Sequence, residues 1–364
     1  MAEGSPRLLS VDVHRGLAVA GMLLVDYQGS EEAAYPALRH AAWNGWTAAD
    51  LVFPSFLFLV GVSVALSVSM RQARGEPPGR VLRHAARRAV MLVALGVLLN
   101  GFPSFALGNW RVLGVVQRIG VCYFAAVALR LWSPRRAPAV GIAVCLAAYW
   151  ALLRFAPVPG LGVPGRDIPF LDPERNLTAW LDRALFPGRL YHGVRDPEGV
   201  LSTLPAIATA LAGVLVGDFL LSSAVPRARQ ALRLGAAGVA AMAAGWLWGR
   251  SFPINKNLWT SSYVVFTAGV AMLVLAGLYW LIEVRGARGP WTVPFLVFGM
   301  NALLGFVLDM LIYLPLRYPQ ASVNGWLLSQ LSPANASLAY AVAVVLLCWL
   351  LLYPLYRARL FLKA

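Results

Sequence analysis

His40 is the residue of this chain best suited to do chemistry, because acidic side chains precede and follow it in a polar segment. The imidazole of histidine titrates near neutral pH, so it can act as a base or as a nucleophile without a metal ion. Asp26 or Asp50 could bind its other ring nitrogen, which would fix the tautomer and stabilise the imidazolium. The alternative is a structural role, which is the usual one for a single histidine at a membrane interface.

The segment that carries His40 leads directly into a long apolar run. Trp43 and Trp46 follow the histidine, and the apolar run begins at about Leu51. Tryptophan is enriched at the interface between membrane and water, and an apolar run of this length is typical of a membrane span. We therefore predict that His40 lies at a membrane surface and that Asp50 marks the entrance of the span.

The composition indicates a membrane protein with several spans. The chain has 364 residues, of which 59% are hydrophobic and 13% charged, which is too apolar for a soluble domain of this size. The net charge of +15 comes from arginines in short clusters between apolar runs, so we attribute it to membrane topology and predict no nucleic-acid partner. The three cysteines fall inside predicted spans, and we expect neither a disulfide nor a metal site.

The predicted fold class is all-α, an integral membrane helical bundle with about ten transmembrane helices. The predicted spans cover residues of about 15–27, 50–70, 89–102, 112–131, 138–155, 200–222, 231–249, 259–283, 292–313 and 336–356. The connection after the second span holds the densest arginine cluster, from Arg71 to Arg88, and the positive-inside rule places it in the cytoplasm. Both termini should then be cytoplasmic, and His40 should lie on the extracytoplasmic side.

The chain is predicted to form a single domain over residues 1–364. Its longest loop, residues 156–198, is rich in proline and glycine and contains one short helical segment at about Leu177–Leu185. We expect this loop to be a folded extracytoplasmic cap within that domain.

Polar side chains inside the predicted spans are further candidates, because ionisable groups are costly in lipid and usually face the bundle interior. They are Asp26, Asp50, Gln117, Arg118, Asn301 and Asp309. The turn 253–259 adds Asn255, Lys256 and Asn257, and Lys256 is one of two lysines in a chain that otherwise uses arginine. Structural alternatives exist: Arg118 could form an ion pair with Asp309 or Asp50, and Asn301 could join helices through hydrogen bonds.

Seven sequence blocks, in order along most of the chain, resemble one known family. They are SVDVHRG at 10–16, VDYQG at 25–29, HAAWNGWTAADLVFP at 40–54, LGVVQRIG at 113–120, DPEG at 196–199, NKNLW at 255–259 and GMN at 299–301. Jointly these blocks are highly specific. By them the chain resembles the heparan-alpha-glucosaminide N-acetyltransferase family.

The resemblance implies a membrane enzyme that takes acetyl from cytoplasmic acetyl-CoA and transfers it to the amine of a terminal glucosamine on the other side. His40 occupies the position of the family's active-site histidine. At Asp26 the chain departs from the pattern, since the better-known members have asparagine there. Lysosomal members carry an extra luminal domain at the N-terminus, so we expect a compact prokaryotic-type member in the plasma (inner) membrane, its active site open to the extracytoplasmic side. The resemblance also favours a homodimer.

Under this interpretation the catalytic candidates are His40, Asp26 and Asp50. Arg118 or Asn301 could bind the developing oxyanion or the pantetheine arm of the donor, and Arg15 could bind the nucleotide of CoA. The other candidates for substrate or donor binding are Asn44, Gln117, Asn255, Lys256, Asn257 and Trp259. We expect acetyl-CoA and an amino-sugar or glycan acceptor as substrates, the lipid bilayer as the surroundings, and no metal.

Two other functions fit the same residues. An O-acetyltransferase of a cell-surface polysaccharide would use the same donor and the same histidine. A solute or proton transporter would instead use Asp26, Asp50, Arg118 and Asp309 to relay protons or bind a solute. The absence of an internal repeat at a fixed period weakens the transporter hypothesis but leaves it open.

Overall fold

The computed structural model describes residues 8–102, 105, 108, 110–133, 136–222 and 224–361. Within these ranges the regular structure is helical, and the loop after α5 adds two isolated β-bridges. The helices are α1 (Leu9–Asp26), α2 (Val52–Ala73), α3 (Pro78–Gly101), α4 (Val115–Trp132), α5 (Arg136–Phe155), α6 (Leu177–Leu185), α7 (Thr203–Leu221), α8 (Arg227–Trp248), α9 (Ser261–Tyr279), α10 (Val293–Met300), α11 (Ala302–Gln330) and α12 (Pro333–Arg357). Short η elements are η1 (Pro36–Leu38), η2 (Ala49–Leu51), η3 (Trp280–Val284) and η4 (Pro290–Thr292). The prediction of an all-α fold is confirmed.

Seven helices in the described part of the chain are long and apolar enough to cross a membrane, or eight if α10 and the start of α11 form one bent span. The seven are α2 with η2, α4, α5, α7, α8, α9 with η3, and α12. The chain is therefore an integral membrane protein. The prediction of ten spans is not confirmed, because α1 and α3 are not among these helices; α1 has Asp12, Arg15 and Asp26 within its 18 residues. The location of the termini stays a prediction.

The predicted span at about 292–313 has a different form in the structure. It is broken at Asn301, where α10 and the first part of α11 meet at 72°. Beyond the break α11 continues for 29 residues in all, to Gln330. The apolar composition of the segment predicts that it can lie in lipid, but hydropathy carries no information about a change in helix direction.

The chain divides into two compact units that are interleaved along the sequence. The first unit includes residues 43–45 and 57–273, and the second includes residues 8–42, 46–56 and 274–361. The expectation of one domain over 1–364 stays a prediction.

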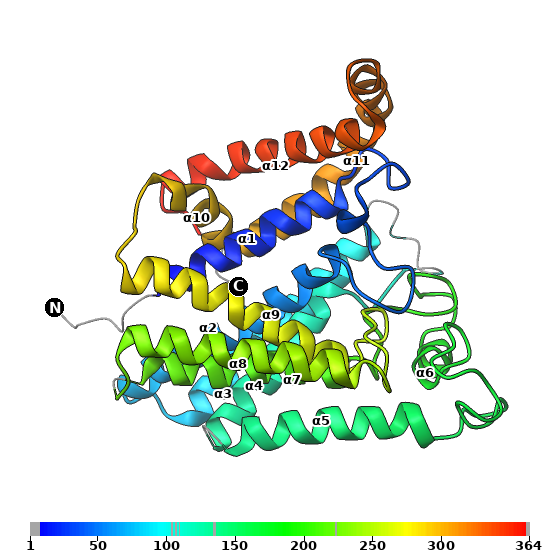
Figure 1. Ribbon diagram of the computed structural model, residues 1–364, viewed down its shortest axis with the longest axis horizontal. Helices are drawn as coiled ribbons and strands as arrows, with labels where there is room; N and C mark the ends of the chain where they lie inside the picture. The colour runs from blue at the N-terminus through cyan, green and yellow to red at the C-terminus, as the bar shows by residue number, and fades with distance from the viewer. Residues whose placement is uncertain are drawn as a thin grey trace. The chain divides into compact units, whose positions relative to one another are not determined.

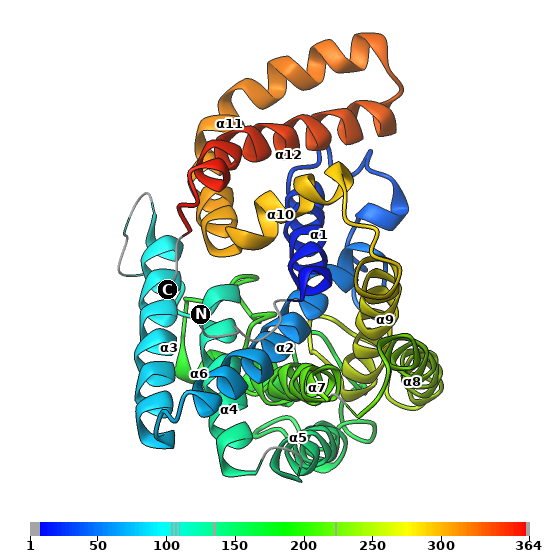
Figure 2. The ribbon, with the colours of Figure 1, turned by 90° about the vertical axis from the view of Figure 1, so that its left-hand side faces the viewer.

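In the first unit, α4 packs against α3, α5 and α7, and α5 also packs against α7. These helices are visible in Figures 1 and 2. Helix α2 approaches α7 closely: a Cβ on Gly61 would lie 1.8 Å from the carbonyl oxygen of Ala210, and a Cβ on Gly213 would lie 1.9 Å from that of Phe58. Only glycine allows this approach, which is the usual way in which membrane helices maximise van der Waals contact.

The predicted cap is part of the first unit, and its helix α6 has the predicted bounds, Leu177–Leu185. The side chain of Asn176 caps this helix by accepting a hydrogen bond of 2.9 Å from the N–H of Ala179. Leu171 of the cap packs in one buried cluster with Tyr149 of α5 and with Phe252. The cap therefore rests on the end of α5 and on the loop after α8.

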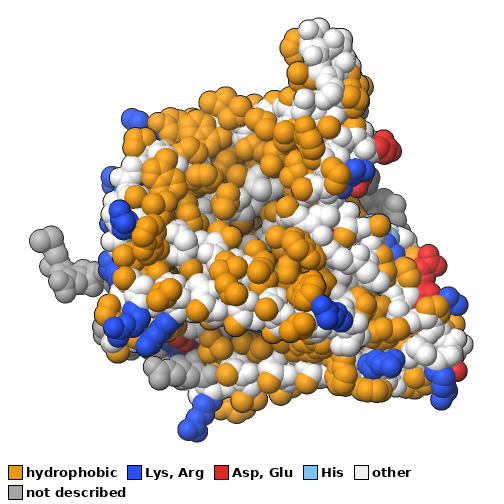
Figure 3. Space-filling model, in the orientation of Figure 1, with side chains coloured by type: hydrophobic (Ala, Val, Ile, Leu, Met, Phe, Trp, Pro, Cys, Tyr) orange, Lys and Arg blue, Asp and Glu red, His pale blue; other side chains and the backbone are white. Residues whose placement is uncertain are grey.

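In the second unit, α1 packs against α10, α11 and α12. A Cβ on Gly16 would lie 1.8 Å from the carbonyl oxygen of Phe295, so the backbones of α1 and α10 are in direct contact. The core of the unit is apolar and includes Leu23 of α1, Phe298 of α10 and Tyr340 of α12. On the face of the whole molecule that Figure 3 shows, hydrophobic side chains cover most of the surface, and most lysines and arginines lie toward its left and right edges. That distribution is expected of helices in lipid.

Candidate functional site

The loop between α1 and α2 places His40 against Asp50. Nδ1 of His40 lies 2.8 Å from Oδ1 of Asp50. The imidazole side chain is 41% exposed, whereas the carboxylate side chain is 1% exposed. Asp50 lies in η2, the short helical turn that leads into α2. The acid is thus fixed in the protein, and the histidine faces outward from it.

The second oxygen of Asp50 holds the loop itself. Oδ2 accepts hydrogen bonds of 3.0 Å from the N–H of Ala41 and of 3.0 Å from the N–H of Thr47. The Thr47 hydroxyl lies 3.2 Å from the same oxygen and donates to the carbonyl oxygen of Arg39 at 2.6 Å. One buried carboxylate therefore organises the backbone on both sides of His40 as well as its ring.

Asp50 is one of the two acids proposed to orient His40, and it contacts the imidazole. Asp26 ends α1 and has an exposed side chain. The next residue, Tyr27, donates a hydrogen bond of 2.5 Å to the backbone carbonyl of Asp309. Asp26 and Asp309 thus belong to the region where α1 meets α11.

Arg15 and Asn301, which also lie in the second unit, flank the contact between α1 and α10. Nη1 of Arg15 forms an ion pair of 3.1 Å with Asp12 and donates a hydrogen bond of 3.2 Å to the carbonyl oxygen of Gly299. Asn301 lies two positions further, at the helix break, and is 1% exposed. The arginine proposed to bind the CoA nucleotide is therefore already paired with a carboxylate of its own helix.

In the first unit, the loop residue Asn44 is joined to the turn before α9. The side-chain amide of Asn255 donates a hydrogen bond of 3.1 Å to Oδ1 of Asn44, and its own Oδ1 accepts from the N–H of Leu258 at 2.9 Å. The N–H of Gly45 donates to the carbonyl oxygen of Ile254 at 2.8 Å. Asn255 is fully buried, so its role in the structure is to shape the turn and hold Asn44.

The same turn places Trp259 beside Arg118. Trp259 adopts a left-handed backbone conformation, with φ of 52°, and its indole N–H donates to the Thr209 hydroxyl at 3.1 Å. The guanidinium carbon of Arg118 lies 5.1 Å from the centre of the Trp259 ring, a cation–π contact. Lys256 and Asn257 lie on this turn and are partly exposed.

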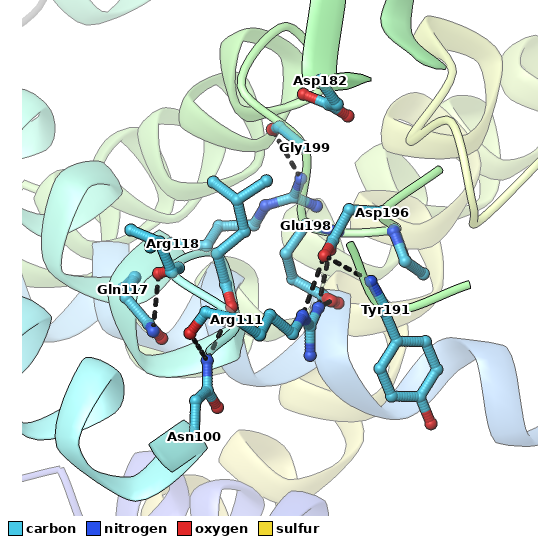
Figure 4. Close-up of polar contacts among 12 residues, drawn as sticks. Asn100, Arg111, Gln117, Arg118, Asp182, Tyr191, Asp196, Glu198 and Gly199 are labelled. Atoms are coloured by element: carbon cyan, nitrogen blue, oxygen red, sulfur yellow. Dashed lines mark hydrogen bonds and ion pairs between the residues drawn. The ribbon is translucent and has the colours of Figure 1, made fainter. Parts of the chain in front are cut away.

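Arg118 is 2% exposed, yet its hydrogen bonds use only one of its three nitrogens. Nη2 donates to the carbonyl oxygen of Gly199 at 3.2 Å (Figure 4). It also donates to the hydroxyl of Ser202 at 2.5 Å. Nε and Nη1 have no hydrogen-bond partner. The predicted ion pairs of Arg118 with Asp309 or Asp50 do not appear among the ion pairs of the described residues. A buried guanidinium with two open donors is a good site for a ligand oxygen.

Gln117, next to Arg118, has a local structural role. Its amide donates to the carbonyl oxygen of Val112 at 2.9 Å, just before the start of α4. A Cβ on Gly96 of α3 would lie 2.3 Å from its amide oxygen, so the side chain fills the contact between α3 and α4. Asn100 of α3 supports the same segment by donating to the carbonyl oxygen of Leu113 at 2.7 Å.

The structure has an ion cluster at the base of the cap that was not predicted from the sequence. The guanidinium of Arg111 contacts Asp196 at 2.8 and 2.6 Å and Glu198 at 2.5 Å (Figure 4). The Asp196 side chain is fully buried, and the guanidinium lowers the pKa of this carboxyl. The block DPEG at 196–199 was a signal for it, but Arg111 is 85 positions away in sequence.

Asp182 of α6 is the second buried acid of the cap. Its Oδ1 accepts a hydrogen bond of 2.9 Å from the N–H of Val200, and its Oδ2 has no hydrogen-bond partner. Burial raises the pKa of Asp182 to about 6, against the opposing effect of the Val200 N–H. Gly199 lies directly against it, since a Cβ there would be 2.0 Å from Oδ2. Among the described residues, no group of three or more His, Cys, Asp or Glu side chains is placed to hold a metal ion.

Comparison with known proteins shows which protein family this chain belongs to. The family model that matches residues 7–244 is described as heparan-alpha-glucosaminide N-acetyltransferase, catalytic. The human protein named heparan-alpha-glucosaminide N-acetyltransferase is 31% identical, over 98% of this chain and 60% of its own length. The mouse protein of the same name is 32% identical, with the same coverage of 98% and 60%. This chain thus spans 60% of the length of these curated relatives.

Proposed function

Because the chain belongs to the heparan-alpha-glucosaminide N-acetyltransferase family, we propose that it transfers an acetyl group from acetyl-CoA to the amine of a terminal glucosamine or related amino sugar. The observation that carries the proposal is the His40–Asp50 pair, with 2.8 Å between Nδ1 and Oδ1. An exposed imidazole held by a buried carboxylate is the arrangement that acyl transfer needs for a base or a nucleophile.

The pair supports Nε2 as the nitrogen of His40 that reacts. A carboxylate next to Nδ1 favours the tautomer that carries its proton there, so the lone pair lies on Nε2. If His40 is the base, Nε2 takes a proton from the amine while the amine nitrogen attacks the thioester carbonyl. The C–N bond then forms, the C–S bond breaks, and the proton passes to the departing CoA thiolate. Asp50 stabilises the imidazolium between these steps.

The second order of events starts with His40 itself as the nucleophile. Nε2 attacks the thioester, the C–S bond breaks, and CoA leaves as its thiolate. The acceptor amine then attacks the acetyl carbon, the bond from this carbon to Nε2 breaks, and the amine proton passes to water, from which the thiolate takes a proton. Both routes consume one acetyl-CoA and one amine, and both need neutral His40. They differ in whether an acetylated enzyme forms. Mass spectrometry can detect it after the protein is mixed with acetyl-CoA alone and the reaction is rapidly quenched.

Two buried side chains with open hydrogen-bonding groups are candidates for binding the substrates. Arg118 has two open donors for the developing oxyanion or for the donor, and Asn301 is an unpaired carboxamide. The arginine distribution along the sequence supports an extracytoplasmic position of His40, so the acceptor would bind there while CoA enters from the cytoplasm. A plasma (inner) membrane of a prokaryote and a homodimer remain parts of the proposal.

The decisive experiment uses the purified protein with acetyl-CoA and two kinds of acceptor. We expect release of CoA thiol with glucosamine-terminated glycans and none with glycans that offer only hydroxyl groups. The reverse preference would support polysaccharide O-acetylation. If no amino sugar elicits acetyl-CoA turnover, and proteoliposomes accumulate a solute without consuming acetyl-CoA, the protein is a transporter and the proposal is wrong.

A further inference from the structure

Asn301 is a buried carboxamide that the folded chain leaves entirely unbonded. It is 1% exposed, and neither Oδ1 nor Nδ2 has a hydrogen-bond partner. Buried polar groups without a partner destabilise the folded state, so such groups are rare in native structures and call for an explanation. The expected role as a link between helices does not supply one, because a link requires the hydrogen bonds that are absent here.

The position of Asn301 is as unusual as its environment. It separates α10 from α11, which meet at 72°. Since α11 begins at Ala302, its first N–H groups have no carbonyl of the same helix to bond to. On the other side of the break, the guanidinium of Arg15 donates to the carbonyl oxygen of Gly299. The break thus gathers hydrogen-bonding groups at a place where most of the helix surface is apolar.

The chemistry of the carboxamide selects the kind of ligand. It offers one donor group and one acceptor, which together match the C=O and N–H of a secondary amide. Depth argues against a charged ligand: Asn301 lies about 16 Å along the helix from Pro290, roughly half of a hydrocarbon core of about 30 Å. Bringing a neutral amide to that depth costs far less than bringing a phosphate.

We propose that Asn301 binds an amide of the pantetheine arm of the acyl donor, at the break between α10 and α11. The inference rests on the proposed function, which supplies a donor whose arm contains two secondary amides. It makes Asn301 a binding residue that recognises the part of CoA common to all its thioesters. Loss of both hydrogen bonds should weaken donor use by about 10- to 100-fold.

The test compares Asn301→Leu with the unmodified protein and with Asn335→Leu, which makes the same change at an exposed asparagine of the same unit. Three donors are used: acetyl-CoA, acetyl-pantetheine, which keeps both amides, and S-acetyl-2-mercaptoethanol, which has none. We expect kcat/KM of Asn301→Leu to fall by about 10- to 100-fold for the first two donors, mainly through KM, and to stay unchanged for the third. Asn335→Leu should match the unmodified protein with all three.

Thermal unfolding distinguishes a binding role of Asn301 from a structural role. Because neither carboxamide atom is bonded, Asn301→Leu should unfold at the same or a higher temperature without ligand, and CoA should raise its unfolding temperature less than that of the unmodified protein. An equal fall with all three donors, or a lower unfolding temperature without ligand, would overturn the inference. So would equal affinity of both proteins for CoA in calorimetry. If the unmodified protein neither binds nor uses acetyl-CoA, the proposed function itself has failed.

Discussion

Asp50 binds His40 through one carboxylate oxygen, at 2.8 Å, and binds the backbone of Ala41 through the other, at 3.0 Å. The ring and the peptide that follows it are therefore held by the same buried group. A change at Asp50 must alter both the direction of the imidazole and the path of its loop, whereas a change at His40 removes the ring alone. The first two predictions use this difference.

Replacement of His40 by alanine should lower kcat by at least 10²- to 10⁴-fold, the range for loss of a general base, while CoA binding survives. The carboxylate of Asp50 keeps its hydrogen bonds to Ala41 and Thr47 in this variant, so the unfolding temperature should fall less than in Asp50→Asn. His192→Ala is the matched control, since this histidine is exposed on the cap. Steady-state kinetics and calorimetry with CoA measure both quantities. A His40→Ala protein with ordinary kcat would remove His40 from the mechanism.

Replacement of Asp50 by asparagine should reduce kcat by about 10²- to 10⁴-fold, because the amide no longer holds the imidazole in the reactive tautomer. The same change at Asp26 should have at least 100-fold less effect, since the structure pairs the ring with Asp50. The unfolding temperature should also fall in Asp50→Asn, because a neutral amide oxygen accepts weaker hydrogen bonds from the N–H groups of Ala41 and Thr47 than the carboxylate does. A larger loss for Asp26→Asn would instead give the orienting role to Asp26.

The choice between Asp26 and Asp50 shows where inference from the sequence ends. Both are carboxylates close to His40 in the chain, and residue type gives no reason to prefer one. The decision depends on the turn at Thr47, which folds the chain back so that Asp50 meets Ala41. Such a turn is set by a three-dimensional network of hydrogen bonds, which a one-dimensional pattern does not contain.

Other features were likewise predicted where they depend on local sequence and missed where they depend on contacts between distant segments. The helix Leu177–Leu185 was predicted with its observed bounds, because a helix with its own cap is a local property. The family assignment from seven blocks is also confirmed. The pairing of Arg111 with Asp196 and the bend at Asn301 were not predicted, since they depend on segments distant in sequence and on packing.

Asp182 should make the stability of the protein depend on pH in the direction opposite to most acids. Its folded-state pKa is raised from 3.8 to about 6, so the folded form binds the proton more tightly than the unfolded form. Its stabilising contribution is therefore full below pH 3.8 and is lost as pH rises to about 6. The whole loss is about 3 kcal/mol, of which roughly 1 kcal/mol falls between pH 5 and pH 7.

Thermal unfolding of Asp182→Asn at these two pH values tests this prediction. The amide mimics the protonated acid, so the variant should gain stability relative to the unmodified protein as pH rises. Asp172→Asn is the control of opposite sign: the pKa of Asp172 is lowered, so its contribution is present above its ordinary pKa and is lost as pH falls. Parallel unfolding curves for Asp182→Asn and the unmodified protein at both pH values would show that Asp182 does not titrate in this range.

Replacement of Arg111 by methionine should destabilise the protein by about 3–5 kcal/mol, because it leaves the fully buried carboxylate of Asp196 without its counter-charge. The double variant Arg111→Met with Asp196→Asn should recover part of this loss, since the amide can still accept the N–H of Tyr191. Denaturant unfolding of the two single variants and the double variant gives the coupling free energy. Strict additivity of the two changes would mean that the ion pair does not hold the cap.

The orientation in the membrane can be tested with two engineered cysteines. Cys122, Cys145 and Cys348 are all buried, so the background of labelling by an impermeant thiol reagent should be low. Ser251, in the loop before α9, and Gly79, at the start of α3, are both exposed. The arginine cluster around Gly79 predicts that this end of α3 lies in the cytoplasm.

We therefore expect Ser251→Cys to react in sealed cells and Gly79→Cys to react only after the membrane is opened. A Cβ at position 79 meets no atom within 4 Å, so the substitution should not disturb the fold. Solubilised protein in detergent, where both positions should react, controls for accessibility. If position 79 reacts in sealed cells and position 251 does not, His40 faces the cytoplasm. The acceptor would then have to be a cytoplasmic amine, and the acetyl group would not cross the membrane.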